Sequence, residues 1–184
     1  MTRRVLLAAL FLPAVAQAQD VMAQVMAALA IVRDSQATFV EEKELPELDR
    51  PLTSRGLLVW HAPDRLEKRT VEPFEERLLV EGDRLLLETR EQHQELSLDT
   101  APEIRPLVEA IRATLAGDAV TLRRYYGISF SGDLAHWRMV LTPLSSRVLA
   151  AVQRITIEGE GGAVLVVERQ GRDGNSRMAV TPGR

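Results

Sequence analysis

The sequence predicts an α+β fold dominated by strands, in which a curved antiparallel sheet holds helices against its concave, apolar side. Three observations lead to this prediction. Short apolar runs recur along the chain and are separated by turns containing glycine and aspartate, as in a β-meander. Two other segments have the three- and four-residue apolar spacing of amphipathic helices. The meander is too long for a flat sheet, so we expect it to curve and to leave an apolar cavity beneath the helices.

The chain begins with the features of an export signal. Two arginines precede an apolar stretch at 5–15, and the "AQA" that follows has the small-x-small pattern of a signal-peptidase site. The apolar stretch, about eleven residues, is shorter than the roughly 20 that cross a bilayer. We therefore predict a cleaved signal peptide at 1–18, one domain at 19–184 and a periplasmic location.

Charge and cysteine content limit the possible partners. The net charge is −3 for the whole chain and −5 without the two leader arginines, which argues against a nucleic-acid partner. The chain contains no cysteine, so a hydrophobic core rather than disulfide bonds must stabilise it.

The N-terminal half predicts one helix followed by strands. Apolar residues at helical spacing indicate a short helix from Asp20 to about Arg33, and "ATFVEEKEL" at 37–45 is typical of a strand. The next strand is "GLLVWHAPDR" at 56–65. The segment 76–88 is the clearest local signal, because two apolar runs flank a Gly-Asp pair and so predict a β-hairpin.

The strand at 56–65 is unusual because it is apolar on both faces. Leu58 and Trp60 share one face, and Leu57 and Val59 share the other. We expect the first pair to line a cavity and the second to pack under a neighbouring loop.

The C-terminal half predicts a second helix and a longer meander. A polar strand at 90–98 precedes a helix at 104–115 with an apolar stripe, which ends at Gly117. A hairpin then turns at Gly132-Asp133. A short helix is expected at 145–152, and three strands separated by glycine-containing turns complete the chain.

No residue pattern predicts catalysis, a bound cofactor or a metal site. Ser129, Asp133 and His136 occur in a suggestive order, but all three lie in one predicted hairpin without the G-x-S-x-G elbow of a hydrolase. Glu91, His93 and Glu95 share one face of a strand, which fits a solvated face better than a metal site. The glycines lie in turns and not before helices, so no phosphate-binding loop is expected.

Several segments, taken in order, resemble the LolA family of periplasmic lipoprotein carriers. They are the leader, the short helix and the stretches "ATFVEE", "GLLVWHAP", "EPFEERLLVEGDRLLL", "LAGD", "GDLAHWRMVLTP" and "ITIEGEGGAVLVVE". The resemblance covers essentially all of 19–184 and is strongest to the family's divergent branch. It implies an unclosed half-barrel whose concave apolar face is lidded by helices.

The resemblance also implies a function and a set of binding residues. The protein would shield the acyl chains of a lipid or lipoprotein between the inner and outer membranes, as a monomer, with an inner-membrane exporter and an outer-membrane receptor as partners. A lipid-sensing regulatory or interaction module of the envelope is the alternative, and an envelope enzyme using Asp133 and His136 is a further one. The residues implied to line the cavity come from both helices and the strands: Val25, Leu29, Phe39, Leu58, Trp60, Leu66, Leu107, Ile111 and Leu115.

Two positions depart from the family pattern. Ala62 stands where the founding carriers have an arginine that holds the lid closed, and Glu41 stands where they have a glutamine. Without this arginine, the sequence does not specify which cargo is carried. A lipoprotein, a free fatty acid, a glycolipid and a polyene lipid are the alternatives.

Overall fold

A computed structural model of the chain describes residues 14–183, with side chains from Asp20 onward. Most of the predicted signal peptide therefore lies outside the described residues, and 14–18 form the start of the first helix. Among the described residues, no helix combines the length and apolar character needed to cross a bilayer.

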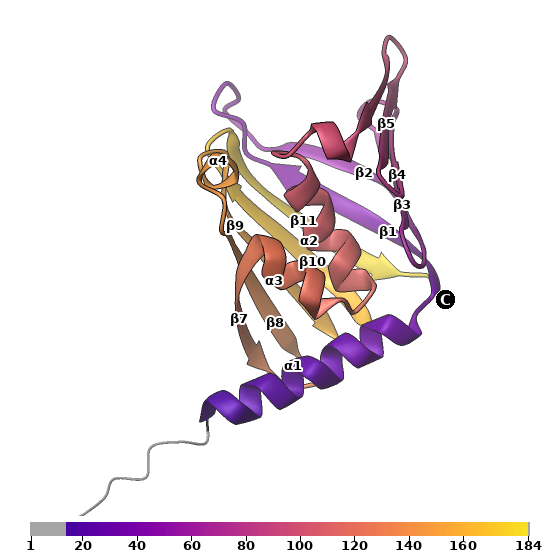
Figure 1. Cartoon of the computed structure of the whole chain (residues 1–184). Helices are drawn as coiled ribbons and strands as arrows, with labels where there is room; N and C mark the ends of the chain where they lie inside the picture. The colour runs from indigo at the N-terminus through magenta and orange to yellow at the C-terminus, as the bar shows by residue number, and fades with distance from the viewer. Residues whose placement is uncertain (1–13, 184) are drawn as a thin grey trace, which may run out of the picture.

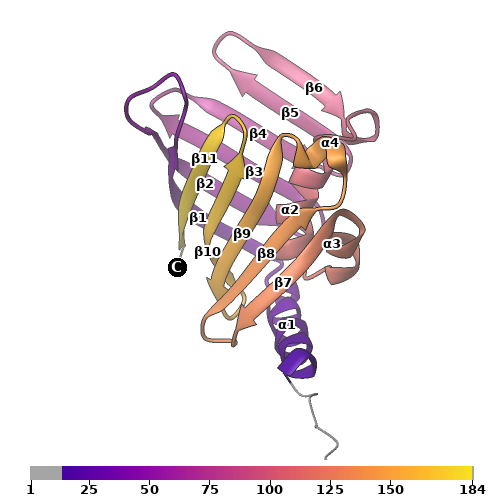
Figure 2. The same cartoon turned by 90° about the vertical axis from the view of Figure 1, so that its left-hand side faces the viewer.

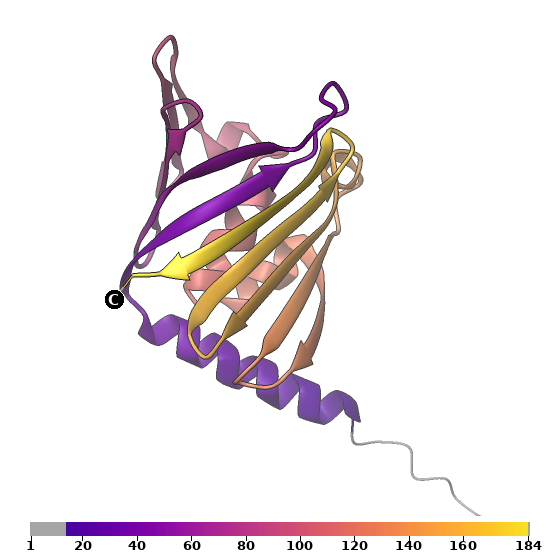
Figure 3. The same ribbon diagram turned by 180° about the vertical axis from the view of Figure 1, so that it is seen from behind.

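One antiparallel sheet of eleven strands forms the body of the molecule (Figure 1). Its spatial order is β6-β5-β4-β3-β2-β1-β11-β10-β9-β8-β7, so β6 and β7 are the two edges and the sheet does not close. Seen from behind, the central strands cross the back of the molecule (Figure 3). The predicted fold class, an unclosed curved sheet with helices, is confirmed. The strands are β1 Asp34–Lys43, β2 Leu52–His61, β3 Arg65–Glu72, β4 Glu76–Glu81, β5 Arg84–Thr89, β6 His93–Ser97, β7 Tyr126–Gly132, β8 Trp137–Pro143, β9 Val152–Glu160, β10 Ala163–Gly171 and β11 Gly174–Pro182.

Within residues 14–183, four α-helices and one 3₁₀ turn accompany the sheet. They are α1 Ala14–Ile31, η1 Leu98–Thr100, α2 Arg105–Leu115, α3 Ala119–Tyr125 and α4 Ser146–Leu149. Figures 1 and 2 show α2 and α3 in front of the concave face and α1 across one end of the sheet. We call this end, where β1 begins, the α1 end. The opposite end, which carries the β1–β2 loop and α4, is the α4 end.

Local sequence signals explain why most elements lie where they were predicted. The hairpin β4–β5 turns at Gly82, whose φ of 57° suits glycine, and α2 ends before Gly117, with a φ of 68°. A side chain at Gly117 would also collide with α1, because a Cβ there would lie 2.2 Å from the carbonyl oxygen of Met26. The glycine therefore permits both the helix end and the close approach of α1.

Three elements were not predicted: η1, α3 and β3. The helix α3 is short and contains β-branched residues, but Asp118 caps it by accepting a hydrogen bond from the backbone N–H of Thr121 at 2.9 Å. The strand β3 is dominated by charged residues that hide its alternation. Its pairing with β2, in which Trp60 lies opposite Leu66, shows that it is an ordinary ladder strand.

Two apolar cores lie on the concave side. The larger core joins α1, α2 and α3 to β7, β8 and β9, and the smaller joins η1 and α2 to β3–β6. The helix α2 contributes to both, with Ala110 and Ala113 in the larger and Ile104 and Val108 against the smaller. Core residues of the larger set include Met22, Val25, Met26, Leu29, Leu122, Tyr126, Trp137, Met139, Leu141, Val152, Ile155 and Ile157.

The convex face holds an ionic cluster around a buried carboxylate. Glu67 on β3 is only 2% exposed and pairs with Arg77 at 2.7 Å, Arg69 at 2.5 Å and Arg65 at 3.7 Å. Burial alone would raise the pKa of Glu67, but the hydrogen bonds from Arg69 and Arg77 outweigh it and hold the pKa below the usual 4.5. Glu67 is therefore charged and satisfied, which explains the arginine-rich sequence around it.

The convex face also corrects one expectation. Leu57 was expected to pack under a loop, but it is 44% exposed. Its cross-strand neighbours are Thr38 on β1 and Arg69 on β3, which places it on the outer surface among polar side chains. The prediction was wrong for Leu57 because the convex side carries no covering loop at this position.

Replacing Glu67 with glutamine should lower the free energy of unfolding by about 1.5–3 kcal/mol at neutral pH, the range for hydrogen bonds to charged groups. Since the folded-state pKa is lowered, this stability is present above about pH 4.5 and is lost as the pH falls through the folded pKa. Urea unfolding across this pH range measures the effect. Glu81→Gln, at the exposed partner of Arg65, is the control and should change stability by less than about 0.5 kcal/mol. Equal losses in both variants would contradict the account.

Candidate functional site

The strand residues predicted to line a cavity share the concave face. In the register of the sheet, Ala37 lies opposite Leu58, and Trp60 lies opposite Leu66. Phe39 lies opposite Gly56 on the same face, because residues two apart on a strand point the same way. The structure therefore brings Phe39, Leu58, Trp60 and Leu66 to one face. Leu66 reaches this face from β3, across the turn that follows β2, and not along one continuous strand.

Gly56 makes room for the ring of Phe39. A Cβ at Gly56 would lie 2.9 Å from Cε1 of Phe39 and 1.8 Å from the carbonyl oxygen of Arg69. No side chain fits in this space, and Phe39 is 2% exposed as a result. An isolated glycine inside an apolar strand signals such a close approach, although the sequence prediction did not use it.

Trp60 anchors the connection between α1 and β1. Its indole Nε1–H donates to the carbonyl oxygen of Val32 at 3.1 Å, and the side chain is 2% exposed. Nearby, the backbone N–H of Ala62 donates to the carbonyl oxygen of Arg33 at 2.7 Å. Ala62 stands where the founding carriers have an arginine. Its backbone thus joins the end of β2 to the connection between α1 and β1.

The predicted helix residues divide into two groups. Val25 and Leu29 on α1 are each 1% exposed and are packed within the larger core. Leu107 and Ile111 on α2 are partly buried against the same core, and Leu115 is half-buried. Residues on α2 consequently retain accessible apolar surface that those on α1 lack.

A strip of partly exposed apolar side chains crosses the central strands on the concave face. Met139 of the larger core is followed, strand by strand, by Ile157, Val167 and Met178 in register. Val180 lies opposite Phe39, on the same face. Unlike the core residues, several members of this face are only half-buried. We call four of them the central strip: Leu58, Val167, Met178 and Val180.

Strand alternation could have identified Val167, Met178 and Val180 as residues of this face. The predicted binding residues, however, included none from β10 or β11. Periodicity shows which side chains share a face. It does not show that the helices cover some strands more completely than others. The partial exposure of the strip is thus a feature that required the structure.

The strip has a polar end. Lys68 pairs with Glu41, and its Nζ lies 4.8 Å from the centre of the Phe39 ring, a cation–π contact. Both charged side chains are mostly buried, at 26% and 19% exposure. Glu41 lies beyond Phe39 toward the α4 end. The concave face therefore changes from apolar to charged along β1 in the direction of the α4 end.

The helix α2 is tied to the β4–β5 turn by arginines. Arg112 donates to the carbonyl oxygen of Gly82, and Arg105 donates to Asp83 at 2.8 Å. Between them, Glu109 is 5% exposed and pairs with Arg112 at 2.5 Å and with Arg105 at 3.8 Å. These contacts fix α2 over the concave face without an arginine at position 62.

A tyrosine adds a tie on the other side of α2. The hydroxyl of Tyr126 donates to the carbonyl oxygen of Pro106 at 2.7 Å. Burial, followed by the nearby charge of Glu109, raises the pKa of Tyr126, so the phenol keeps its proton and remains a donor. The N-terminal part of α2 is therefore joined to both β7 and the β4–β5 turn.

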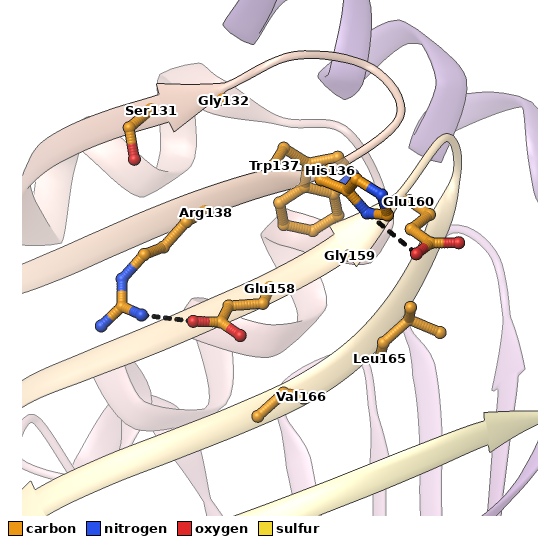
Figure 4. A pocket seen from close by; sticks show the side chains of 10 residues that line it. All are labelled: Ser131, Gly132, His136, Trp137, Arg138, Glu158, Gly159, Glu160, Leu165 and Val166. Atoms are coloured by element: carbon orange, nitrogen blue, oxygen red, sulfur yellow. Dashed lines mark hydrogen bonds and ion pairs between the residues drawn. The ribbon is translucent and has the colours of Figure 1, made fainter.

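The residues considered for catalysis do not form a triad. Asp133 accepts hydrogen bonds from the backbone N–H groups of Ala135 and His136, both at 2.9 Å, and these bonds lower its pKa. The ring of His136 pairs instead with Glu160 at 2.9 Å (Figure 4). Ser129 is exposed on β7. Figure 4 also shows Arg138 paired with Glu158 in the same pocket of about 370 Å³. Its charged groups are therefore engaged with one another.

The side chains considered for metal binding are also engaged elsewhere. His93 lies 3.1 Å from a carboxylate oxygen of Glu88, and Glu95 pairs with Arg84 at 2.7 Å. Among the residues whose side chains are described, no three His, Cys, Asp or Glu converge on a metal position.

Comparison with known proteins relates this arrangement to a family. The family model described as outer membrane lipoprotein carrier protein LolA-like matches residues 13–183. No curated protein sequence matches the chain significantly.

Similar solved structures were also found. A LolA superfamily protein from Nitrosomonas europaea is 11% identical with a TM-score of 0.46, over 89% of this chain and 91% of that one. The MucA/MucB complex of Pseudomonas aeruginosa is 14% identical with a TM-score of 0.47, over 91% of this chain and 58% of that one. The lipoprotein LppX of Mycobacterium tuberculosis is 8% identical with a TM-score of 0.40, over 89% of this chain and 94% of that one.

The family model spans almost all of the described residues, from the first helix through the last strand of the sheet. The resemblance seen in the sequence is thereby confirmed, and the chain belongs to the family of LolA-like outer membrane lipoprotein carrier proteins.

Proposed function

We propose that the protein is a periplasmic carrier that shields acyl chains on its concave face while a lipid or lipoprotein passes between the inner and outer membranes. The observation that carries this proposal is the central strip, where apolar side chains remain partly exposed and Val167 borders the larger core. Family membership supports it. An inner-membrane exporter and an outer-membrane receptor are the partners that such a role requires.

The proposed binding surface consists of the central strip and the accessible side of α2. Leu58, Leu66 and the strip residues on β10 and β11 form the floor, and Leu107, Ile111 and Leu115 form the roof. Phe39 and Trp60 support the floor from buried positions. Val25 and Leu29 act from the core, where they fix α1.

The free energy of wetting an acyl chain explains why a carrier needs such a surface. Each methylene removed from water contributes about 0.8 kcal/mol, so a chain of about fourteen methylenes would cost on the order of 11 kcal/mol to expose. A protein surface must recover most of this free energy, yet release to the acceptor requires that it not recover all of it. A half-covered strip under a movable helix meets both conditions.

The helix α2 is the element that must move to admit a chain. Its apolar contacts divide between two cores, and its ties to the β4–β5 turn are made by Arg105 and Arg112. Local opening of a single helix requires a lower free energy than unfolding of the whole fold. We infer that these arginines replace the family latch and set the free energy of opening.

The adjacent leucines of β2 provide a matched test of the binding face. Leu58→Glu places a charge on the half-buried concave face and should abolish binding of a fluorescent fatty-acid probe. Leu57→Glu makes the same change on the exposed convex face and should bind like the unchanged protein. Probe titration, with circular dichroism to verify folding, measures both.

A Leu57→Glu variant that loses binding as completely as Leu58→Glu would contradict the assignment of the concave face. So would a folded Leu58→Glu variant with unchanged affinity.

The arginine ties predict a local change in dynamics. Arg112→Gln removes a charged donor from both Glu109 and the carbonyl of Gly82, and should lower the opening free energy of α2 by about 1.5–3 kcal/mol. Hydrogen exchange should accelerate in 105–115 more than in β8 and β9. Arg123→Gln, at an exposed position on α3, is the control and should leave α2 unchanged. Uniform acceleration across the sheet would show that Arg112 stabilises the whole fold rather than α2.

A further inference from the structure

Positive charge is concentrated in one part of an otherwise acidic chain. The net charge is −3, yet the segment 119–157 contains five arginines and a single acidic residue, Asp133. The function proposed above uses none of these arginines. Their placement in the fold therefore calls for a separate explanation.

Four of these arginines and a fifth from a distant turn meet at the α4 end. The end of α3 adjoins α4 because the backbone N–H of Leu144 donates to the carbonyl oxygen of Tyr125 at 2.9 Å. The β10–β11 turn adjoins α4 because the N–H of Arg172 donates to the carbonyl oxygen of Ala151 at 3.0 Å. Figure 2 shows α3 and α4 together on this side. We call this group of residues the basic corner: Arg123, Arg124, Arg147, Arg154 and Arg172. Within it, Arg154 lies opposite Gln170 on the convex face of β9, whereas Arg123 and Arg124 belong to α3 on the concave side.

All five residues of the basic corner are exposed, and none forms an ion pair with another residue whose side chain is described. Three carboxylates that adjoin these arginines are already engaged. Glu44 accepts a hydrogen bond from the side-chain amide of Asn175 at 3.0 Å. Asp173 pairs with Arg169 at 2.8 Å and with Lys43 at 3.8 Å, and Asp118 caps α3. The arginines of the β3–β4 hairpin behave differently, because Arg65 and Arg77 neutralise carboxylates.

Two apolar side chains lie among these charges. Leu144, directly before α4, is 63% exposed, and Leu149, at the end of α4, is 41% exposed. Arg147 lies between them in the sequence. Exposed apolar groups surrounded by arginine are the composition of a membrane-contacting surface, in which apolar groups enter the headgroup region and cations remain at the phosphates.

We propose that the basic corner docks the protein on an anionic phospholipid membrane. Guanidinium groups bind phosphate oxygens in pairs, and their charges attract an anionic leaflet. The charges come from four separate chain segments, so they suit laterally mobile headgroups better than the fixed carboxylates of a folded partner. Because the rest of the chain is acidic, such a membrane repels other orientations and selects this one.

The proposal does not depend on acyl-chain binding at the central strip. Its test is cosedimentation of protein purified from the periplasm with vesicles. One vesicle type is pure phosphatidylcholine, and the other contains an equal amount of phosphatidylglycerol. Binding is expected only to the second and should weaken as salt is added.

Matched variants locate the contact. Each arginine lost should weaken binding about fivefold, and the charge reversal Arg147→Glu should weaken it by more. Arg33→Glu makes the same change at an exposed residue of the α1 end and should bind normally. For the apolar part, Leu144→Ser should weaken binding, whereas Ile31→Ser, at a 79% exposed residue of the α1 end, should not.

Three results would overturn the proposal. They are equal binding to both vesicle types, equal losses for Arg147→Glu and Arg33→Glu, and capture by an acidic protein with no binding to phosphatidylglycerol vesicles. A fatty-acid probe titration of the same variants distinguishes failure of the membrane-docking proposal from failure of the carrier function. Arg147→Glu should leave probe binding unchanged.

Discussion

The open sheet imposes the constraint on which the rest of the molecule depends. Because β6 and β7 are free edges, the eleven strands cannot bury their concave face by closing into a barrel, and helices must cover it. The N-terminal helix α1 fills one end, and α2 spans the two cores. Apolar surface that neither helix fully covers remains over the central strands. The same geometry that leaves the sheet open thus creates the proposed binding surface.

Charges in this protein serve different purposes on the different surfaces. On the convex face, arginines surround the buried Glu67 and stabilise the strands. Under the β4–β5 turn, Arg105 and Arg112 hold the helix that we propose must move. At the basic corner, arginines have no carboxylate partner among the described side chains. The polar end of the central strip faces the same α4 end, so docking there would bring the headgroup end of a bound lipid toward the membrane.

Much of the fold could be predicted because local signals and tertiary packing agree. The glycine turn of β4–β5 and the apolar stripe of α2 are examples, since each element buries the face that its periodicity marks. Prediction failed where charge obscures the pattern, as in β3, where Glu67 on the convex side pairs with Arg65 and Arg69 of the same strand. It also missed α3, whose capping residue Asp118 gives a weaker signal than a long apolar stripe.

The candidate site was predictable only in part, for a physical reason. Alternation placed Leu58 and Trp60 on one face, and the register of the sheet adds Phe39 and Leu66 to it from the neighbouring strands. Whether such a face is filled or open depends on how far the helices extend over it. That coverage follows from contacts between residues distant in sequence, such as the hydrogen bond from the Arg112 side chain to the backbone carbonyl oxygen of Gly82.

Native mass spectrometry of protein purified from the periplasm tests the central claim most directly. If the concave face carries acyl chains, part of the protein should retain a bound species, and extraction should identify it as an acylated lipid or lipoprotein. Gentle collisional activation should release this species without unfolding the protein. Protein that is entirely free of acyl compounds, and that remains so after incubation with fatty acid, would contradict the account.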